Sequence, residues 1–318
     1  MRAINCNLCG SDEYALVDAH RKDKYCRPEV EVRAVICKNC GLVYVNPQID
    51  ESELHNLYAT NYAETRHDLP DEKVLQRMEA MAEERWKWLE KRAPMNGHGG
   101  KVLDMGCSAG SLLNAFQKKG WDAYGVEPTP HYAEFARERY GLKITTGFLE
   151  EANLPSSYYD MVTLTQTLEH LADPTQALLR IRGLLKDGGL VYIDVPNIVK
   201  PKHFRFFEAP HLYTFSPNTM SLLLRKTGFE PIIIENGWDV RAVARKGGTV
   251  GNIDFSSQGD DYKEIISNLK WRHARLWLHL AQGWLTSKVS LTIRRIFGES
   301  AGRKILGLIK RLLHQTEG

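Results

Sequence analysis

From residue 101 to residue 245 the chain alternates between short apolar runs that are typical of strands and patterns that are typical of helices. We expect strands at 101–104, 121–127, 142–146, 159–165 and 189–195, and helices at 110–119, 130–140, 174–186 and 217–227. Two further apolar runs, 230–235 and 239–244, flank Asn236-Gly237, which is a strong hairpin signal. Repeated strand–helix units of this kind predict an α/β fold, with a doubly wound, mostly parallel sheet and an antiparallel edge.

The expected helix ends are marked by capping residues. Asp173-Pro174 and Ser216-Pro217 have the form of an N-cap followed by a first helical residue. Glycines stand where C-terminal caps belong, at Gly120, Gly141, Gly188 and Gly228.

The charge of the chain is uneven. Its 318 residues carry a net charge of +3, but residues 262–318 hold eleven Lys and Arg against three Glu, which leaves +8 there and −5 in residues 1–261. With 43% hydrophobic and 25% charged residues the composition is that of a globular protein. The sequence has no apolar run long enough for a transmembrane helix and no apolar signal region, so we expect a cytoplasmic protein.

Four of the six cysteines form two C-x-x-C pairs, Cys6 with Cys9 and Cys37 with Cys40, each followed by a glycine. Two such turns complete a tetrahedral Zn²⁺ site, and four thiolates leave no open position, so the metal would be structural. Redox-active or unligated cysteines are the alternative. The remaining two, Cys26 and Cys107, are expected to be packed side chains.

The first strand of the alternating region ends in Leu103-Asp104-Met105-Gly106-Cys107-Ser108-Ala109-Gly110, a glycine-rich turn into a helix. Such a turn presents backbone N–H groups to a ligand. A carboxylate at Asp104 would repel a pyrophosphate but attract an ammonium or sulfonium group, and S-adenosylmethionine carries both. Glu127 ends the second strand 23 residues later, where an acid reaches ribose hydroxyls.

Two later segments supply candidate substrate and base residues. His170 follows the fourth strand, where active-site groups of open α/β sheets lie, although a histidine bonded to backbone at a helix start is the alternative. Residues 196–213 follow the fifth strand and combine prolines, aromatics and basic residues, as a substrate lid would. Lys202 and Arg205 there are candidates for binding a phosphate group.

The ordered set LDMGCSAG, GVEP, YYDMVTLTQTLEHLADP and LLKDGGLVYIDVP resembles the class I S-adenosylmethionine-dependent methyltransferases, over about residues 101–245. The segments CNLCG and CKNCGLVYVNP resemble the zinc-ribbon extension of one branch, which is common in bacterial sugar and cell-surface polysaccharide synthesis. The resemblance implies a Rossmann-like sheet of seven strands with a small N-terminal zinc ribbon and a helical C-terminal tail.

The same resemblance implies roles for individual residues. The methionine part of the cofactor would lie on Asp104, Gly106 and Gly110, and the ribose on Glu127. The adenine would lie between Phe148 and Leu149, with Gln166 also at the cofactor. The segment His211-Leu212-Tyr213-Thr214-Phe215-Ser216 is similar to one in the zinc-ribbon enzymes, which makes His211 a second candidate base and Tyr213 a candidate substrate contact.

Two other features have competing interpretations. Tyr58 and Tyr62 would either close over the bound substrate and cofactor or pack the zinc module against the core. Within the tail, residues 304–313 form an amphipathic cationic pattern with tryptophans upstream, as in helices that lie on a membrane surface. Packing on the body or on a second subunit is the alternative, and nucleic acid is not expected because the basic surface lies only in the tail.

We therefore expect five parts: a zinc ribbon (1–50), a helical connector or lid (51–95), the cofactor-binding domain (96–246), a linker (247–261) and the basic tail (262–318). The leading hypothesis is an S-adenosylmethionine-dependent methyltransferase that acts on a small polar or glycosylated acceptor, either a nucleotide sugar or a lipid-linked glycan at the inner face of the membrane. The alternatives are a quinone- or lipid-type O-methyltransferase and a zinc-bearing binding protein with a relic cofactor fold.

Overall fold

The computed structural model describes residues 2–22, 31–56, 69–95, 99–200 and 211–251, together with 253, 255, 262–263 and 265–267. Residues 1–265 form one compact unit and residues 266–318 a second. Nearly all of the predicted basic tail therefore lies outside the described residues. Among the described helices, none is long and apolar enough to cross a bilayer.

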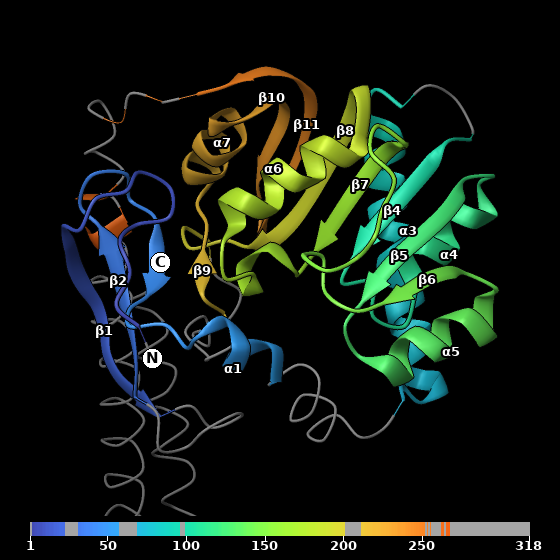
Figure 1. Ribbon diagram of the computed structural model, residues 1–318, viewed down its shortest axis with the longest axis horizontal. Coiled ribbons are helices and arrows are strands. Elements are labelled where there is room, and N and C mark those ends of the chain that lie inside the picture. Colours follow the sequence, from blue (N-terminus) through green and yellow to red (C-terminus); the bar gives the residue numbers. More distant parts are fainter. Residues whose placement is uncertain are drawn as a thin grey trace, which may run out of the picture. The chain divides into compact units, whose positions relative to one another are not determined.

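A seven-stranded sheet forms the centre of the first unit (Figure 1). Its strands, in spatial order, are β10 (Thr227–Asn236), β11 (Asp239–Val250), β8 (Leu185–Pro196), β7 (Tyr159–Thr165), β4 (Lys101–Met105), β5 (Asp122–Glu127) and β6 (Lys143–Thr146). The five strands from β8 to β6 are parallel, and the β10–β11 hairpin pairs antiparallel with β8. The predicted doubly wound sheet with an antiparallel edge is confirmed.

Helices cover both faces of this sheet (Figure 1). One face packs on α6 (Pro174–Leu184) and α7 (Pro217–Lys226). The other packs on α3 (Glu72–Arg92), α4 (Ser111–Lys118) and α5 (Pro130–Tyr140). Each face has its own buried core, because parallel strands with helices on both sides are shielded from water on both sides.

The predicted helix starts are confirmed, but one predicted helix end is wrong. Asp173 caps α6 and Ser216 caps α7 through their side chains. At the other end of α6 the chain turns directly into β8 at Leu185, so Gly188 caps no helix. It has a φ of +72° and lies in an irregular stretch of β8, where the register against β7 shifts between Tyr159 and Met161.

The last strand is longer than the sequence pattern indicates. β11 continues to Val250 and pairs there with Thr227 of β10. Residues 247–250, expected to belong to the linker, are therefore part of the sheet.

A second, four-stranded sheet is built mainly from the N-terminal segment. Its antiparallel strands are β1 (Tyr14–Lys22), β2 (Glu31–Cys37), β3 (Val43–Val45) and β9 (Tyr213–Thr214). The fourth strand, β9, lies in the segment that follows β8 of the large sheet. One continuous segment of the chain therefore contributes a strand to each sheet. A short helix, α1 (Glu51–Asn56), follows this module.

Candidate functional site

The glycine-rich turn between β4 and α4 has an unusual backbone. Gly106, Ser108 and Gly110 all have positive φ, of +72°, +48° and +78°. A Cβ at Gly110 would lie 2.6 Å from Leu142 Cδ1, so glycine is required there for the start of α4 to pack closely. The Gly106 N–H donates to the Val126 carbonyl at 2.8 Å, which fixes the turn beside the end of β5. The turn thus holds the ends of β4 and β5 together.

Two buried carboxylates flank this turn. Burial raises the pKa of Asp104 to about 7, against the effect of the Thr163 hydroxyl, which donates to it at 2.6 Å. Burial also raises the pKa of Glu127, whose two oxygens accept from the Ser108 N–H at 2.8 Å and the Thr129 N–H at 2.9 Å. Each Glu127 oxygen keeps a lone pair for another donor. This geometry suits hydroxyl groups at Glu127 and a cationic ligand group near Asp104.

The residues expected near adenine lie beyond β6. Phe148 is half-buried, and the His55 ring of α1 stacks on it with ring centroids 3.9 Å apart. Leu149 is buried in the core. Gln166 is exposed, has a φ of +53°, and donates its backbone N–H to the Asp194 carbonyl at 2.8 Å. One face of the Phe148 ring is therefore already covered by a residue of the N-terminal part of the chain.

The structure brings the two candidate bases together. The rings of His170 and His211 meet edge to face with centroids 4.7 Å apart. Glu169, which sequence reasoning left without a role, joins them: its Oε1 lies 3.9 Å from His170 Nε2. Its side chain is 1% exposed, and in the described part of the chain neither carboxyl oxygen has a hydrogen-bond partner. Burial, reinforced by the charge of Asp194 and Asp239, raises the pKa of Glu169 to about 8.

This cluster adjoins the glycine-rich turn. A Cβ at Gly106 would lie 2.9 Å from the Thr167 hydroxyl oxygen, so the turn packs against the residues after β7. His170 follows three residues later, at the end of the 3₁₀ turn η2 (Leu168–His170). The histidine pair and the turn therefore lie on adjoining parts of the carboxyl edge of the sheet, where open α/β sheets bind ligands.

Of the residues expected to contact substrate, only Tyr213 is described, and the structure places it in β9. Its ring is buried, and its hydroxyl donates to the Ala172 carbonyl at 3.0 Å. These contacts tie β9 to the loop after β7. The other four, Tyr58, Tyr62, Lys202 and Arg205, lie outside the described residues.

A buried ion pair that sequence reasoning missed lies at the same edge. Arg85 of α3 donates to Asp194 of β8 at 2.7 Å, and Arg241 of β11 lies 3.5 Å from the same carboxylate oxygen. Asp194 is fully buried, and its Oδ1 has no hydrogen-bond partner among the described residues. An aspartate within the apolar run Val191-Tyr192-Ile193-Asp194-Val195 was the signal for it, because buried charges are retained where they are paired.

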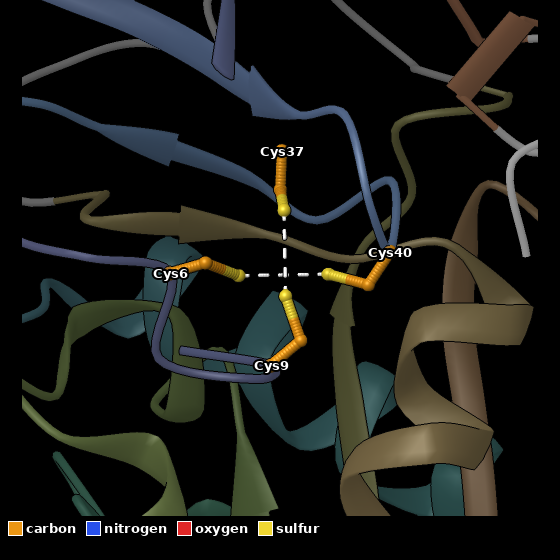
Figure 2. A group of neighbouring side chains, drawn as sticks. All are labelled: Cys6, Cys9, Cys37 and Cys40. Atoms are coloured by element: carbon orange, nitrogen blue, oxygen red, sulfur yellow. Dashed lines mark hydrogen bonds between the residues drawn. The ribbon is translucent and has the colours of Figure 1, made fainter. Parts of the chain in front are cut away.

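The four cysteines form one cluster (Figure 2). Cys6 and Cys40 have their sulfurs 3.5 Å apart, as do Cys9 and Cys37, and all four sulfurs lie within 4.8 Å of one another. Four sulfurs at about 2.3 Å from a tetrahedral Zn²⁺ would be about 3.8 Å apart, so the cluster fits this ion. Hydrogen bonds among the thiols raise the pKa of Cys6 and Cys40 and lower that of Cys37 to about 7 and that of Cys9 further. Cys107 is buried in the core, as expected, and Cys26 lies outside the described residues.

A doubly wound sheet with a glycine-rich turn after its first strand and an acid after its second is found in class I S-adenosylmethionine-dependent methyltransferases as well as in dinucleotide-binding folds, and the family match decides between them. Residues 74–233, half of the chain, match the family described as methyltransferase domain, and the chain belongs to this family. The predicted enzyme class is confirmed.

Curated relatives agree with this class. An enzyme named ubiquinone biosynthesis O-methyltransferase from Cereibacter sphaeroides is 30% identical over 161 residues, which cover 44% of this chain and 64% of the relative. One of the same name from Bordetella avium is 28% identical over 167 residues, 46% of this chain and 68% of the relative. The chain thus spans less than two thirds of the first relative.

Among solved structures, 1,6-didemethyltoxoflavin N1-methyltransferase from Burkholderia thailandensis, bound to its acceptor and S-adenosylhomocysteine, is similar in fold. It has a TM-score of 0.52 and 20% identity, and the match covers 72% of this chain and 99% of that one. The likeness supports the Rossmann-like fold.

Proposed function

We propose that this protein transfers a methyl group from S-adenosylmethionine to a hydroxyl group of a small acceptor. The observation that carries the proposal is the cluster of Glu169, His170 and His211 beside the glycine-rich turn. Such a cluster would serve an acceptor that must lose a proton when it is methylated.

In this proposal the turn and the two acids hold the cofactor. Glu127 accepts from the ribose hydroxyls with the lone pairs that its backbone partners leave unused. Asp104, Gly106 and Gly110 hold the methionine part, and Phe148, Leu149 and Gln166 lie around the adenine. The bound cofactor supplies an electrophilic methyl group on a sulfonium, so these residues mainly align the donor with the acceptor.

The histidine pair accepts the proton of the acceptor. When one imidazole takes the proton it becomes cationic, and the nearby Glu169 carboxyl, with its pKa of about 8, ionises more readily beside that new charge. The proton that Glu169 releases passes to water, and the resulting carboxylate offsets the imidazolium charge until the imidazolium also returns its proton to water.

The acceptor class has two candidates. An aromatic hydroxyl of a quinol-type compound is favoured by the relatives named ubiquinone biosynthesis O-methyltransferase. A glycan hydroxyl, on a nucleotide sugar or a lipid-linked glycan, is the other candidate, because the two cysteine segments resemble the zinc-ribbon enzymes of sugar and polysaccharide synthesis.

A transfer assay tests the proposal. Full-length protein is incubated with isotopically labelled S-adenosylmethionine and a panel of catechols, quinols and nucleotide sugars, and methylated products are detected by mass spectrometry. We expect one class of hydroxyl acceptor to gain a methyl group, with loss of transfer in a His170→Ala, His211→Ala double variant. Transfer by that variant at the wild-type rate would contradict the assigned base.

We also propose that the four cysteines hold a structural Zn²⁺. The supporting observation is the fit of the sulfur distances to a tetrahedral ion. Elemental analysis of protein purified under reducing conditions without chelator is expected to give one zinc per chain. Protein that is folded and active without zinc would overturn this assignment.

We further propose that residues 262–318 bring a cytoplasmic enzyme to a membrane surface through cationic amphipathic segments. Sedimentation with anionic vesicles at low salt is expected to pull down the full chain and not a chain ending at residue 261. Equal sedimentation of the two chains would contradict the proposal, and concentration-dependent self-association without vesicles would favour packing on a second subunit.

A further inference from the structure

The segment from Glu169 to Thr175 connects β7 to α6 and carries His170. Two of its carbonyl groups are held by β9 and the residue before it: the Leu212 N–H donates to the Glu169 carbonyl at 2.8 Å, and the Tyr213 hydroxyl donates to the Ala172 carbonyl at 3.0 Å. The segment that carries the candidate base is thus held from outside the large sheet.

A third contact comes from Asn7, which lies between the first two cysteines of the cluster. Its side-chain amide donates to Asp173 Oδ1 at 2.8 Å. Its Oδ1 accepts from the Thr175 hydroxyl at 2.6 Å and from the Thr175 N–H at 3.2 Å. These contacts join residues that are more than 160 positions apart in the sequence.

Asn7 completes the cap of α6. Asp173 itself accepts from the N–H of Gln176 through its side chain and from that of Ala177 through its carbonyl. The first helical residue is proline and has no N–H. The Thr175 N–H is the remaining donor of the first helical turn, and Asn7 accepts from it. The helix start is therefore fully bonded only when the turn Cys6–Cys9, which we call the cysteine turn, is in place.

Helix α7 contacts the cysteine turn. Lys226 at the last residue of that helix donates to the carbonyls of Asn7 and Leu8, each at 2.9 Å. Asn7 therefore lies between the end of one helix and the start of another, both of which pack on the same face of the large sheet.

We propose that Asn7 is a positioning residue for methyl transfer: through Asp173 and Thr175 it fixes the Glu169–Thr175 segment, and with it the imidazole of His170 against that of His211. The inference rests on the proposed function, because it assigns the histidine pair to the reaction. Through Asn7, the four-cysteine cluster affects catalysis, although no cysteine lies at the reacting atoms.

The test compares Asn7→Ala with Asn5→Ala in the full-length protein. Asn5 is an exposed asparagine two residues away and serves as the matched control. We expect Asn7→Ala to lower kcat at least tenfold, while the KM for S-adenosylmethionine, the calorimetric affinity for S-adenosylhomocysteine and the zinc content stay within twofold of wild type. Asn5→Ala is expected to leave all four quantities unchanged.

A double-mutant cycle with Thr175→Val identifies the contact responsible. Valine has the shape of threonine but lacks the hydroxyl that donates to Asn7. If the contact contributes to the effect, Thr175→Val lowers kcat by less than Asn7→Ala does, because the contacts of Asn7 with Asp173 and the Thr175 N–H remain. The double variant then loses less than the two single variants together. Fully additive losses would overturn the assignment to this contact.

Hydrogen exchange provides a readout that does not depend on activity. We expect peptides covering residues 168–177 to exchange at least fivefold faster in Asn7→Ala than in wild type, with unchanged exchange in β4 and β5. A wild-type protein that neither binds S-adenosylmethionine nor transfers methyl groups would refute the proposed function, whatever the exchange shows. An Asn7→Ala variant with the wild-type kcat, or with losses of cofactor affinity and kcat in equal proportion, would refute the positioning role.

Discussion

The two sheets of this protein are stabilised in different ways. The seven-stranded sheet is covered by helices on both faces, and its central strands β4, β7 and β8 are largely buried. The four-stranded sheet has exposed apolar side chains on β1, with Tyr14 47% and Leu16 53% exposed, and its buried part gathers around the four cysteines. The large sheet has a core under α3, α4 and α5 in which the small sheet takes no part, whereas the small sheet depends on the cysteine cluster, on β9 and on the core that it shares with the α6–α7 face of the large sheet.

The two sheets also contribute different parts of the proposed site. The cofactor residues Asp104, Gly106 and Glu127 belong to strands and turns of the large sheet. His211 directly precedes the Leu212–Thr214 stretch that pairs with β3 of the small sheet. Cofactor binding should therefore survive damage to the small sheet, and catalysis should not.

The largest expected effect comes from breaking the cysteine cluster. A Cys37→Ser, Cys40→Ser double variant is expected to lose zinc and to lower kcat at least a thousandfold, because a structural Zn²⁺ supplies about 10 kcal/mol of folding free energy to its module. Affinity for S-adenosylhomocysteine, measured by calorimetry, should stay within threefold of wild type. Cys26→Ser is the control, and full activity of the double variant would show that the small sheet needs no metal.

Removing a histidine tests the part of the site that the two sheets share. His170→Ala and His211→Ala are each expected to lower kcat by about a hundredfold or more, as loss of a general base does, with cofactor affinity unchanged. Added imidazole should partly restore the variant that lacks the proton-accepting ring and not the other. Equal activity of both variants and wild type in steady-state assays would remove the histidines from the mechanism.

A smaller effect is expected in the cofactor part of the large sheet. Glu127→Gln should weaken binding of S-adenosylhomocysteine about tenfold to thirtyfold, because it removes the charge from two hydrogen bonds to hydroxyl groups, worth about 1.4 to 2 kcal/mol. Glu134→Gln, on the exposed side of α5, is the matched control. The calorimetric titration checks this, and the same affinity for both variants would place the ribose elsewhere.

The last prediction concerns the pH dependence of stability, and no effect on activity is needed to test it. Glu169 has a folded pKa raised to about 8, so between its unfolded pKa and pH 8 the folded state binds more protons than the unfolded state. The free energy of unfolding should therefore fall as pH rises from 5 to 8, by at most about 1.4 kcal/mol per pH unit from this group. Urea denaturation should show a shallower fall for Glu169→Gln, and parallel curves would mean that Glu169 is ionised in the folded protein.

Local signals predicted most of the large sheet, because strand–helix alternation, Asp173-Pro174 and Asn236-Gly237 each have a short-range physical cause. The end of α6 was missed, because the irregular stretch around Gly188 depends on the register of β8 against β7. The spacing of the cysteines also predicted the cysteine cluster, and the glycine pattern predicted the turn after the first strand. Neither the pairing of β9 with β3 nor the contact of Asn7 with Thr175 was, because both join distant segments and leave no periodic pattern.

The most direct test of the account is a calorimetric titration of the full-length protein with S-adenosylhomocysteine. The glycine-rich turn with Asp104 and Glu127 predicts saturable binding to one site in the micromolar range. The Cys37→Ser, Cys40→Ser variant should bind within threefold of wild type, because that site belongs to the large sheet. Absence of binding to wild type at millimolar ligand would contradict the assignment of this edge of the sheet as a cofactor site.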